Sequence, residues 1–213
     1  MIKISKTSKL DNIKSWSLQA VDTCPGSADG KGGLVDACKG CYATTGMYNF
    51  STVKAPRLHN QEDRKRDKWV ADMVASMKKA KFFRWFDSGD VYDLKLARKI
   101  YQVMQQTPHV QHWFPTRMMK FSKFQATLNG MQELPNVMVR FSSDAVDGSY
   151  TVGVHGSCIV SSSDADTDAK ICTAPLTDGK CDGCRACYDK SVPVIAYVAH
   201  GFKMRKVINI NAI

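Results

Sequence analysis

Long hydrophobic runs are missing from the sequence. Residues 1–6 carry lysines with no apolar stretch behind them, and no segment approaches the length of a membrane-spanning helix. These absences lead us to expect a cytoplasmic protein with no signal peptide and no place in a membrane. Structural disulfides are rare in the reducing cytosol, so the eight cysteines of the chain need a different explanation.

Two widespread catalytic motifs are missing as well. The chain has neither a glycine-rich P-loop nor a G-x-S-x-G nucleophile turn, so it offers no phosphate cradle and no serine nucleophile of those types. Internal repeats and long low-complexity stretches are also absent. The 213 residues, 44% of them hydrophobic, are enough for one generous domain or two small ones with a real core.

Basic residues outnumber acidic ones and give a formal net charge of +10. Such a charge favours polyanionic partners, nucleic acid among them, although a merely basic surface is an equally simple explanation. The charged segment 57–68 mixes both signs, which fits a solvated helix face better than a nucleic-acid-binding stripe.

Strand and helix patterns alternate through the first two thirds of the chain. This order predicts an α/β fold with a parallel sheet. Four strands, with two later candidates, are too few for a complete eight-fold barrel. We therefore expect a partial (β/α) barrel over residues 1–150 and a Cys-rich metal-binding segment with a closing strand over residues 151–213. The expected strands are 13–20, 82–86, 110–115 and 136–141, with 151–154 and 192–199 later, and the expected helices are 60–79, 94–105 and 120–128.

Polar residues follow the expected strands, and function in α/β folds gathers at the carboxyl ends of parallel strands. The candidate catalytic residues there are Asp87, Asp90, Arg117 and Asp144. A carboxylate in that place suits a general acid or base, and an arginine suits a bound carboxylate or phosphate. The simpler alternatives are that Asp90 or Asp93 caps the following helix and that Arg117 forms a surface salt bridge.

Four cysteines near the C-terminus have the sharper spacing. Cys181, Cys184 and Cys187 follow the pattern C-x2-C-x2-C, with Cys172 upstream, so their thiolates can converge on one centre. A fourth cysteine beyond three at this spacing is typical of bacterial ferredoxins, and four thiolates also suit zinc. The surrounding segment is too poor in aliphatic residues to build its own core, so a metal would staple it. Gly183 would ease the tight turn.

Three further cysteines lie near the N-terminus as Cys24-x13-Cys38-x2-Cys41, with no obvious fourth. Three ligands on a cubane cluster leave one iron open to substrate or cofactor, and three on zinc leave room for water. Cys158, a histidine or a carboxylate is the alternative closing ligand. Because clustered cysteines are ligands more often than core residues, all eight are candidate metal ligands.

Several short motifs resemble a known family. They are Thr23-Cys24-Pro25, Cys38-x2-Cys41-Tyr42-Ala43, the strand ending in Asp87-Ser88-Gly89-Asp90, and the C-terminal Cys-rich segment followed by residues 194–200. Together they are similar to phage-encoded, three-cysteine proteins that look like relatives of radical S-adenosylmethionine enzymes. The resemblance implies a partial barrel with a 4Fe–4S cluster at its mouth, a redox or radical-like reaction, and the cytoplasm of an infected host cell.

The resemblance also implies cofactor-binding roles. Tyr42 corresponds to the aromatic residue beside the last cysteine of such enzymes. Ser88, Gly89 and Asp90 take the place of the turn that contacts the amino group of S-adenosylmethionine. The first two cysteines are farther apart here than in radical enzymes, and a double-glycine–glutamate turn is absent. The implied partner is an unidentified small-molecule substrate or electron donor.

Two other classes of protein remain open from the sequence. The basic charge and the C-terminal cysteines together suit a metal-stapled nucleic-acid-binding protein, with zinc or iron–sulfur as the metal. An electron-transfer or cluster-carrier protein is the third class, although a mouth that contains aspartate, arginine and serine is more than a carrier requires.

Overall fold

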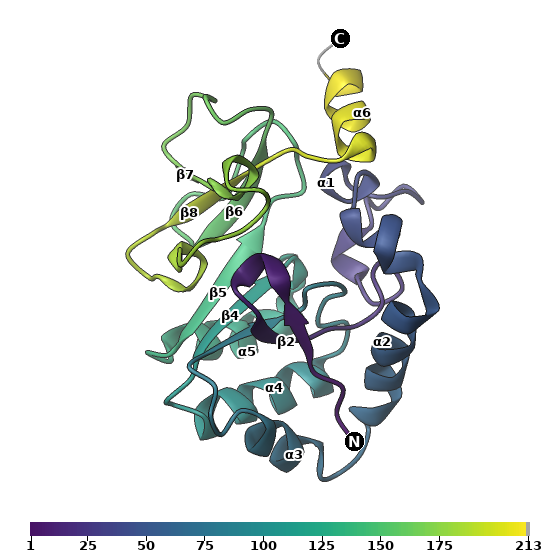
Figure 1. Ribbon diagram of the computed structural model, residues 1–213, viewed down its shortest axis with the longest axis vertical. Coiled ribbons are helices and arrows are strands. Elements are labelled where there is room, and N and C mark those ends of the chain that lie inside the picture. The colour runs from purple at the N-terminus through teal and green to yellow at the C-terminus, as the bar shows by residue number, and fades with distance from the viewer. Residues whose placement is uncertain (212–213) are drawn as a thin grey trace.

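A computed structural model describes residues 1–211 of the chain. Within that range eight strands form one sheet in the order β1-β2-β3-β4-β5-β6-β8-β7 (Figure 1). Only the β1–β2 pair is antiparallel. The strands are β1 Ser5–Thr7, β2 Ile13–Trp16, β3 Phe82–Trp85, β4 Gln111–Thr116, β5 Val137–Ser142, β6 Gly156–Val160, β7 Lys170–Ile171 and β8 Val194–Val198.

The predicted fold class is confirmed, because a mostly parallel sheet alternates with helices. Within the described range β1 and β7 are the two edges of the sheet, which is therefore not closed into a barrel. The helices are α1 Asp36–Lys39, α2 Ser51–Asp63, α3 Trp69–Ser76, α4 Leu94–Gln106, α5 Ser122–Glu133 and α6 Phe202–Asn211. No helix of the described residues is long and apolar enough to cross a membrane.

Helices α3, α4 and α5 lie together at one end of the molecule and cover one face of strands β2 to β5 (Figure 1). Side chains alternate between the faces of a strand, so Phe83 and Trp85 of β3 point into this layer. Trp16 meets Trp69 there edge to face, with ring centroids 5.4 Å apart. Each large aromatic side chain buried in this way stabilises the fold by about 2–3 kcal/mol.

Helix α4 illustrates how the local sequence sets an element. Asp93 caps it by accepting a hydrogen bond from the backbone of Leu96 at 2.8 Å, which confirms the capping alternative for this residue. The helix spans Leu94–Gln106, which agrees with the predicted helix at 94–105. Its buried face carries residues at helical spacing, namely Leu96, Ala97, Ile100, Val103 and Met104.

The predicted helix at 60–79 is wrong, because the chain forms two helices with a turn at 64–68 between them. Lys99 of α4 reaches into this turn and donates from Nζ to the backbone carbonyls of Arg64 and Arg66, each at 2.9 Å. The side chain of Arg66 also pairs with Asp63 before the break and with Asp72 after it. Lys99 thus supplies donors to two carbonyls whose helical hydrogen bonds the break removes.

The predicted strand at 151–154 is also wrong, since Val152 is 85% exposed in a loop and the strand is β6, which starts at Gly156. The predicted strand at 13–20 is shorter than expected and ends at Trp16. The backbone of Leu18 then bonds to the carbonyl of Ser88 instead of a neighbouring strand. The β5–β6 pairing carries the sheet past residue 150, and the division of the chain there stays a prediction.

Candidate functional site

Cys24, Cys38 and Cys41, the N-terminal cysteine set, gather where the loop after β2 meets α1. Cys24 follows β2, Cys38 lies in α1 and Cys41 comes just after that helix. Burial is the main cause that raises the pKa of all three thiols, to about 12 for Cys24. The charges of Cys38 and Cys41 also raise the pKa of Cys24, so the three thiols lie in one region of the fold. The role of this predicted set as a ligand set stays a prediction.

Gly26 lets the loop that carries Cys24 pack tightly on the segment after β4. A Cβ atom at position 26 would lie only 2.7 Å from the Cβ atom of Arg117. Lys120 donates from Nζ to the carbonyl of Gly26 at 2.8 Å, and the hydroxyl of Ser27 donates to the carbonyl of Cys24 at 2.6 Å. A side chain larger than hydrogen at position 26 would therefore displace the first cysteine.

Asp90 ties the same loop to strands β3 and β4. Its carboxylate accepts hydrogen bonds from Thr116 Oγ1 at 2.8 Å and from the backbone of Arg117 at 2.9 Å, and its own backbone donates to Thr23 at 3.1 Å. Burial raises the pKa of Asp90, although these donors oppose the change. Both carboxylate oxygens are already engaged at the end of β4, while the backbone of Asp90 contacts the cysteine loop, and a catalytic role for Asp90 stays a prediction.

The Ser88-Gly89 turn packs against that loop from the other side. The hydroxyl of Ser88 donates to the carbonyl of Leu18 at 2.7 Å. Gly89 has a φ of +79°, and a Cβ atom there would lie 2.7 Å from both Leu18 Cβ and Thr23 Oγ1, so only glycine fits. Because the side chain of Ser88 is engaged internally, what this turn offers a ligand is mainly its backbone.

Arg117 and Asp144 form an ion pair beside the N-terminal cysteine set. Arg117 Nε lies 3.3 Å from Asp144 Oδ1, Lys120 contacts the other carboxylate oxygen, and the Arg117 guanidinium donates to the carbonyl of Ser143 at 2.9 Å. The salt-bridge alternative for Arg117 is therefore confirmed. Arg117 lowers and Asp144 raises the pKa of Cys38, whose pKa is raised mainly by burial, so both charges lie near that thiol.

Asp87 is the centre of a network of two arginines and two tyrosines. Its carboxylate accepts hydrogen bonds from Tyr48 at 2.7 Å and from Arg84 at 2.8 Å, and a terminal nitrogen of Arg57 lies 3.9 Å away. The hydroxyl of Tyr42 donates to the backbone carbonyl of Asp87 at 2.5 Å. Since Tyr42 follows Cys41 directly, this network adjoins the N-terminal cysteine set.

The other four clustered cysteines, Cys172, Cys181, Cys184 and Cys187, form the C-terminal cysteine set. Burial is the main cause that raises the pKa of Cys181 to about 11, and the charges of the other three act in the same direction. The predicted tight turn is present, because Gly183 has a φ of +79°. This second predicted set therefore also lies in one region of the fold, and its role as a ligand set stays a prediction.

The N-terminal hairpin supports the C-terminal cysteine set. The backbone of Cys181 donates to the carbonyl of Lys9 at 2.8 Å, and the backbone of Gly183 donates to the carboxylate of Asp11 at 3.1 Å. Arg185 pairs with the same carboxylate at 2.8 Å. Residues from the two ends of the chain therefore build one side of this set.

Cys158 belongs to neither set. It lies in β6 opposite Ala196 of β8, and residues paired in register on parallel strands share a face of the sheet. That face is apolar and includes Val160. Tyr197, the residue after Ala196, points to the opposite face, where its hydroxyl lies 3.3 Å from the sulfur of Cys187. The register of β6 thus directs the Cys158 side chain away from the C-terminal cysteine set.

Two arginines with little solvent exposure were not predicted as site residues. Arg84 lies over the ring of Trp113, 4.6 Å from its centroid, and Arg140 is fully buried. Arg140 donates five hydrogen bonds to backbone carbonyls, three of them within the segment from Ala186 to Asp189 around Cys187. A single arginine inside an otherwise apolar strand was the available indication in both cases, because a charge is buried only where it has partners.

Within the described residues, no group of three or more histidine, cysteine or carboxylate side chains has the arrangement of a metal site. Fold and site together define a mostly parallel α/β protein with two separate groups of cysteines. The chain belongs to the family described as Gene product 88, a phage-related family whose model matches residues 2–196. No curated protein and no solved structure matches the chain. The expected phage relationship is thereby confirmed at the level of the family.

Proposed function

We propose that this protein is an iron–sulfur protein in which the N-terminal cysteine set holds a 4Fe–4S cluster with one open iron. The observation that supports the proposal is that Cys24, Cys38 and Cys41 lie in one largely shielded region after β2, whereas Cys158 lies in a separate apolar cluster. Three thiolates leave one position of a cubane cluster without a protein ligand, so a substrate or cofactor can bind there.

The chemistry of the surroundings fits such a cluster. The thiols must lose their protons to bind metal, and burial opposes this by raising their pKa. Arg117 counteracts that effect at both Cys38 and Cys41, Lys120 does so at Cys38, and Lys203 at the start of α6 does so at Cys41. Positive charge from the segment after β4, which carries Arg117 and Lys120, and from α6 would stabilise the net negative charge of a thiolate-bound cluster.

The C-terminal cysteine set is proposed to hold a second, closed metal centre, iron–sulfur or zinc. With four thiolates it has no position left for a substrate. Its role is to fix a segment that lies between the N-terminal hairpin and β8 and has few aliphatic residues.

The proposed reaction is redox or radical-like, with S-adenosylmethionine as the ligand of the open iron. When bound, the cluster and S-adenosylmethionine together would supply a one-electron reduction and an organic radical. The residues of this chain would position the ligand: Tyr42 beside Cys41, and the backbone of the Ser88-Gly89-Asp90 turn. Asp87 and Asp144 remain the carboxylates placed to exchange a proton, since both are partly exposed at the strand ends.

Anaerobic purification followed by an iron, zinc and acid-labile sulfide count tests the proposal. Replacement of Cys24, Cys38 and Cys41 together by alanine should remove about four iron atoms and four sulfides per chain, whereas Cys158→Ala should remove none. Reduction with added S-adenosylmethionine should release 5′-deoxyadenosine from the wild type only. A protein with stoichiometric zinc and no sulfide would overturn the proposal, and iron without cleavage would leave a non-radical redox role.

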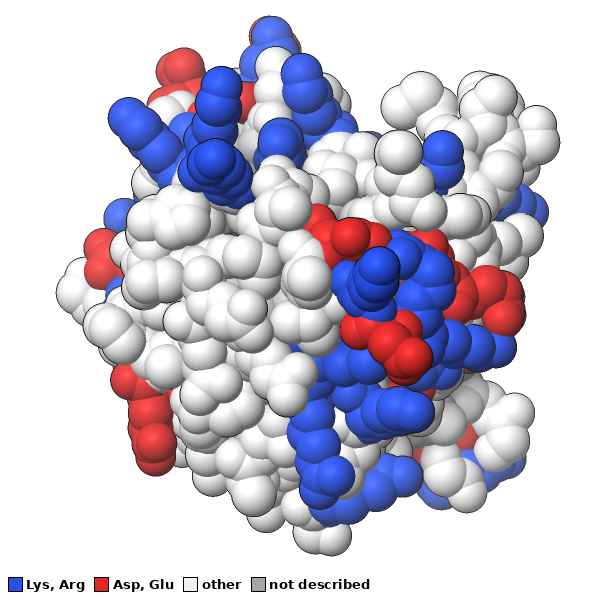
Figure 2. Space-filling model, turned by 90° about the horizontal axis from the view of Figure 1, so that it is seen from below, with Lys and Arg blue, Asp and Glu red and all other residues white. Residues whose placement is uncertain are grey.

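Nucleic-acid binding is the second candidate function, favoured by the net charge of +10. Figure 2 shows Lys and Arg side chains in separate groups on one face, with Asp and Glu among them. Several basic residues of segment 57–68 are already paired, for instance Arg64 with Asp93 and Lys65 with Glu62. Binding to DNA or RNA that weakens steeply as salt is added would support this function, and no binding at low salt would exclude it.

A further inference from the structure

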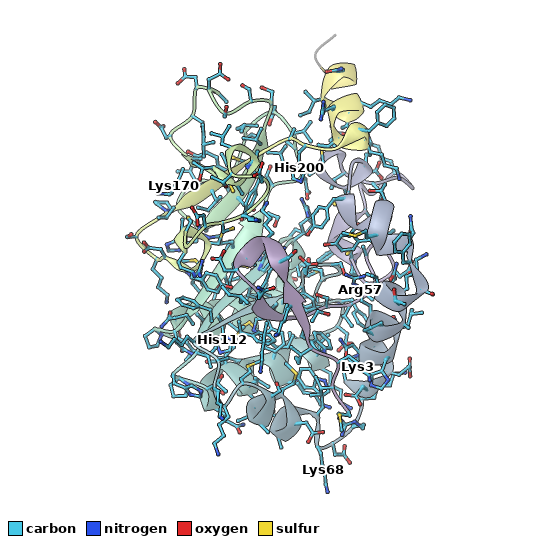
Figure 3. The ribbon with its side chains drawn as sticks, viewed as in Figure 1. Lys3, Arg57, Lys68, His112, Lys170 and His200 are labelled. Atoms are coloured by element: carbon cyan, nitrogen blue, oxygen red, sulfur yellow. The ribbon has the colours of Figure 1, made fainter. Side chains whose placement is uncertain are left out.

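Arg57 and Arg84 share a single carboxylate. Arg57 comes from α2, the helix that flanks the sheet in Figure 3, and Arg84 comes from β3. Both approach Asp87, Arg84 with a hydrogen bond of 2.8 Å and Arg57 with a contact of 3.9 Å. Tyr42 and Tyr48 add only neutral hydroxyl groups to the network. The network therefore has one positive charge in excess.

The two guanidinium groups are largely buried, and few of their N–H donors have an acceptor. The side chain of Arg57 is 11% exposed and that of Arg84 is 12% exposed. Within the part of the chain that the structure describes, Arg84 donates two hydrogen bonds and Arg57 donates one, to the carbonyl of Val53 in its own helix. The Nε atoms of both are buried without an acceptor. Most of their N–H donors are thus unused.

Arg140 gives the comparison within the same molecule. It is fully buried as well, and it makes five hydrogen bonds, as many as an arginine has N–H groups. An arginine with a purely structural role is therefore saturated in this fold. Buried donors without acceptors are costly, and a guanidinium group matches the paired oxygens of a carboxylate or phosphate. The difference between Arg140 and the pair at Asp87 points to a ligand.

We propose that Arg57 and Arg84 bind an oxyanion, a carboxylate or a phosphate group, carried by a small-molecule ligand at the strand ends. The aromatic rings hold both guanidinium groups in orientation: Arg57 lies 4.7 Å from the ring centroid of Tyr48, and Arg84 lies 4.6 Å from that of Trp113. Tyr42 hydrogen-bonds to this network and follows Cys41, so the oxyanion would lie beside the N-terminal cysteine set.

The site deepens the proposed function, because it assigns the substrate that reacts beside the cluster to small molecules that carry an oxyanion. Only that assignment rests on the proposed function. Binding of an anion to the two arginines needs no cluster, and the two ideas can therefore fail separately.

Thermal unfolding of the full chain with added sodium phosphate or sodium acetate, against sodium chloride at equal ionic strength, tests the site. One or both oxyanions should raise the melting temperature of the wild type in a saturable way, and their relative midpoints identify phosphate or carboxylate as the preferred group. Arg57→Gln and Arg84→Lys should each shift that midpoint at least tenfold upward. Arg98→Gln, at an exposed position of α4, should leave it unchanged.

An equal response of the Arg57→Gln and Arg98→Gln variants would overturn the site, as would a wild type that responds to neither oxyanion beyond chloride. Arg57→Gln decides the matter if Arg84→Lys fails to fold, since Arg57 has only a distant contact with Asp87. The same titration on chain without iron separates this idea from the cluster. Saturable binding there, together with an absent iron and sulfide count, would retain the oxyanion site and remove the proposed cluster.

Discussion

Arg140 on β5 donates from Nε to the backbone carbonyl of Cys187 at 3.0 Å. Its terminal nitrogens reach the carbonyls of Ala186 and Asp189 at 2.9 and 3.0 Å, and no carboxylate is among its hydrogen-bond partners in the described residues. A buried cation thus fixes the backbone around Cys187, beside the apolar cluster that Tyr188 forms with Leu10 and Trp113. The position of Cys187 depends on a strand interior rather than on its own loop.

The first prediction concerns this contact. Arg140→Gln should leave several backbone carbonyls buried without a donor and destabilise the protein by about 3–5 kcal/mol. Urea unfolding of wild type and variant measures the change. Arg98→Gln, an exposed arginine on α4, is the matched control and should stay within about 0.5 kcal/mol of the wild type. Equal stability of the two variants would show that the carbonyls find other donors, such as water.

The second prediction separates backbone strain from packing at Gly89. Gly89 and Gly153 have φ values of +79° and +83°, but only a Cβ atom at position 89 meets other atoms, at 2.7 Å. Gly153→Ala should cost about 1 kcal/mol, the strain of a left-handed residue, and Gly89→Ala about 3 kcal/mol because overpacking is added. Chemical unfolding of both variants gives the comparison. If the two variants differ in stability by less than about 0.5 kcal/mol, the loop with Cys24 moves to accommodate the added methyl group at little cost.

The sequence was sufficient for the fold class because its strands and helices repeat locally. Helix 94–105 and the parallel strands around it follow from periodicity, and the polar residues at the strand ends follow from the order of the strands. The break at 64–68 could not be predicted from the local sequence, because the lysine that donates to its carbonyls comes from α4. Strands β1 and β7 have three and two residues, too few to show a period.

The candidate site was predictable to the extent that spacing decides it. Cysteine spacing placed Cys24, Cys38 and Cys41 in one set because short loops keep their ends close. The face on which Cys158 lies depends on the register between β6 and β8, and a shift of one residue would reverse it. The burial of Arg57 was missed for a related reason. A mixed charged segment looks solvated until the network at Asp87 is known.

The third prediction follows from the place of Cys158. Its side chain is 1% exposed within an apolar cluster that includes Val160 and Val194. Cys158→Ala should lower the free energy of unfolding by about 1–2 kcal/mol, because a buried sulfur is removed, while the metal content stays unchanged. Cys172→Ala should instead lower the metal content. Metal analysis and urea unfolding of both variants check this. Loss of metal in Cys158→Ala would show that Cys158 is a metal ligand after all.

The fourth prediction concerns His112, which lies in β4 near the helical end of the molecule (Figure 3). Trp85 donates from Nε1 to His112 Nδ1 at 3.3 Å. The hydroxyl of Thr107 donates to Val103, so its oxygen is left to accept the proton of His112 Nε2 at 2.9 Å. The ring is therefore neutral with its proton on Nε2. Burial is the main cause that lowers the pKa of His112 from 6.5 to about 3.

Because the folded pKa of His112 is lowered, the unfolded chain binds one more proton at this residue between pH 6.5 and about 3. Its contribution to stability is complete above pH 6.5 and is lost as the pH falls through that window, with a slope of up to about 1.4 kcal/mol per pH unit. His112→Gln has no such proton, so its stability should fall less steeply between pH 6 and 4 in urea unfolding. His200→Gln, at an exposed position, should keep the wild-type slope. Parallel slopes for the wild type and His112→Gln would mean that His112 takes up its proton without unfolding.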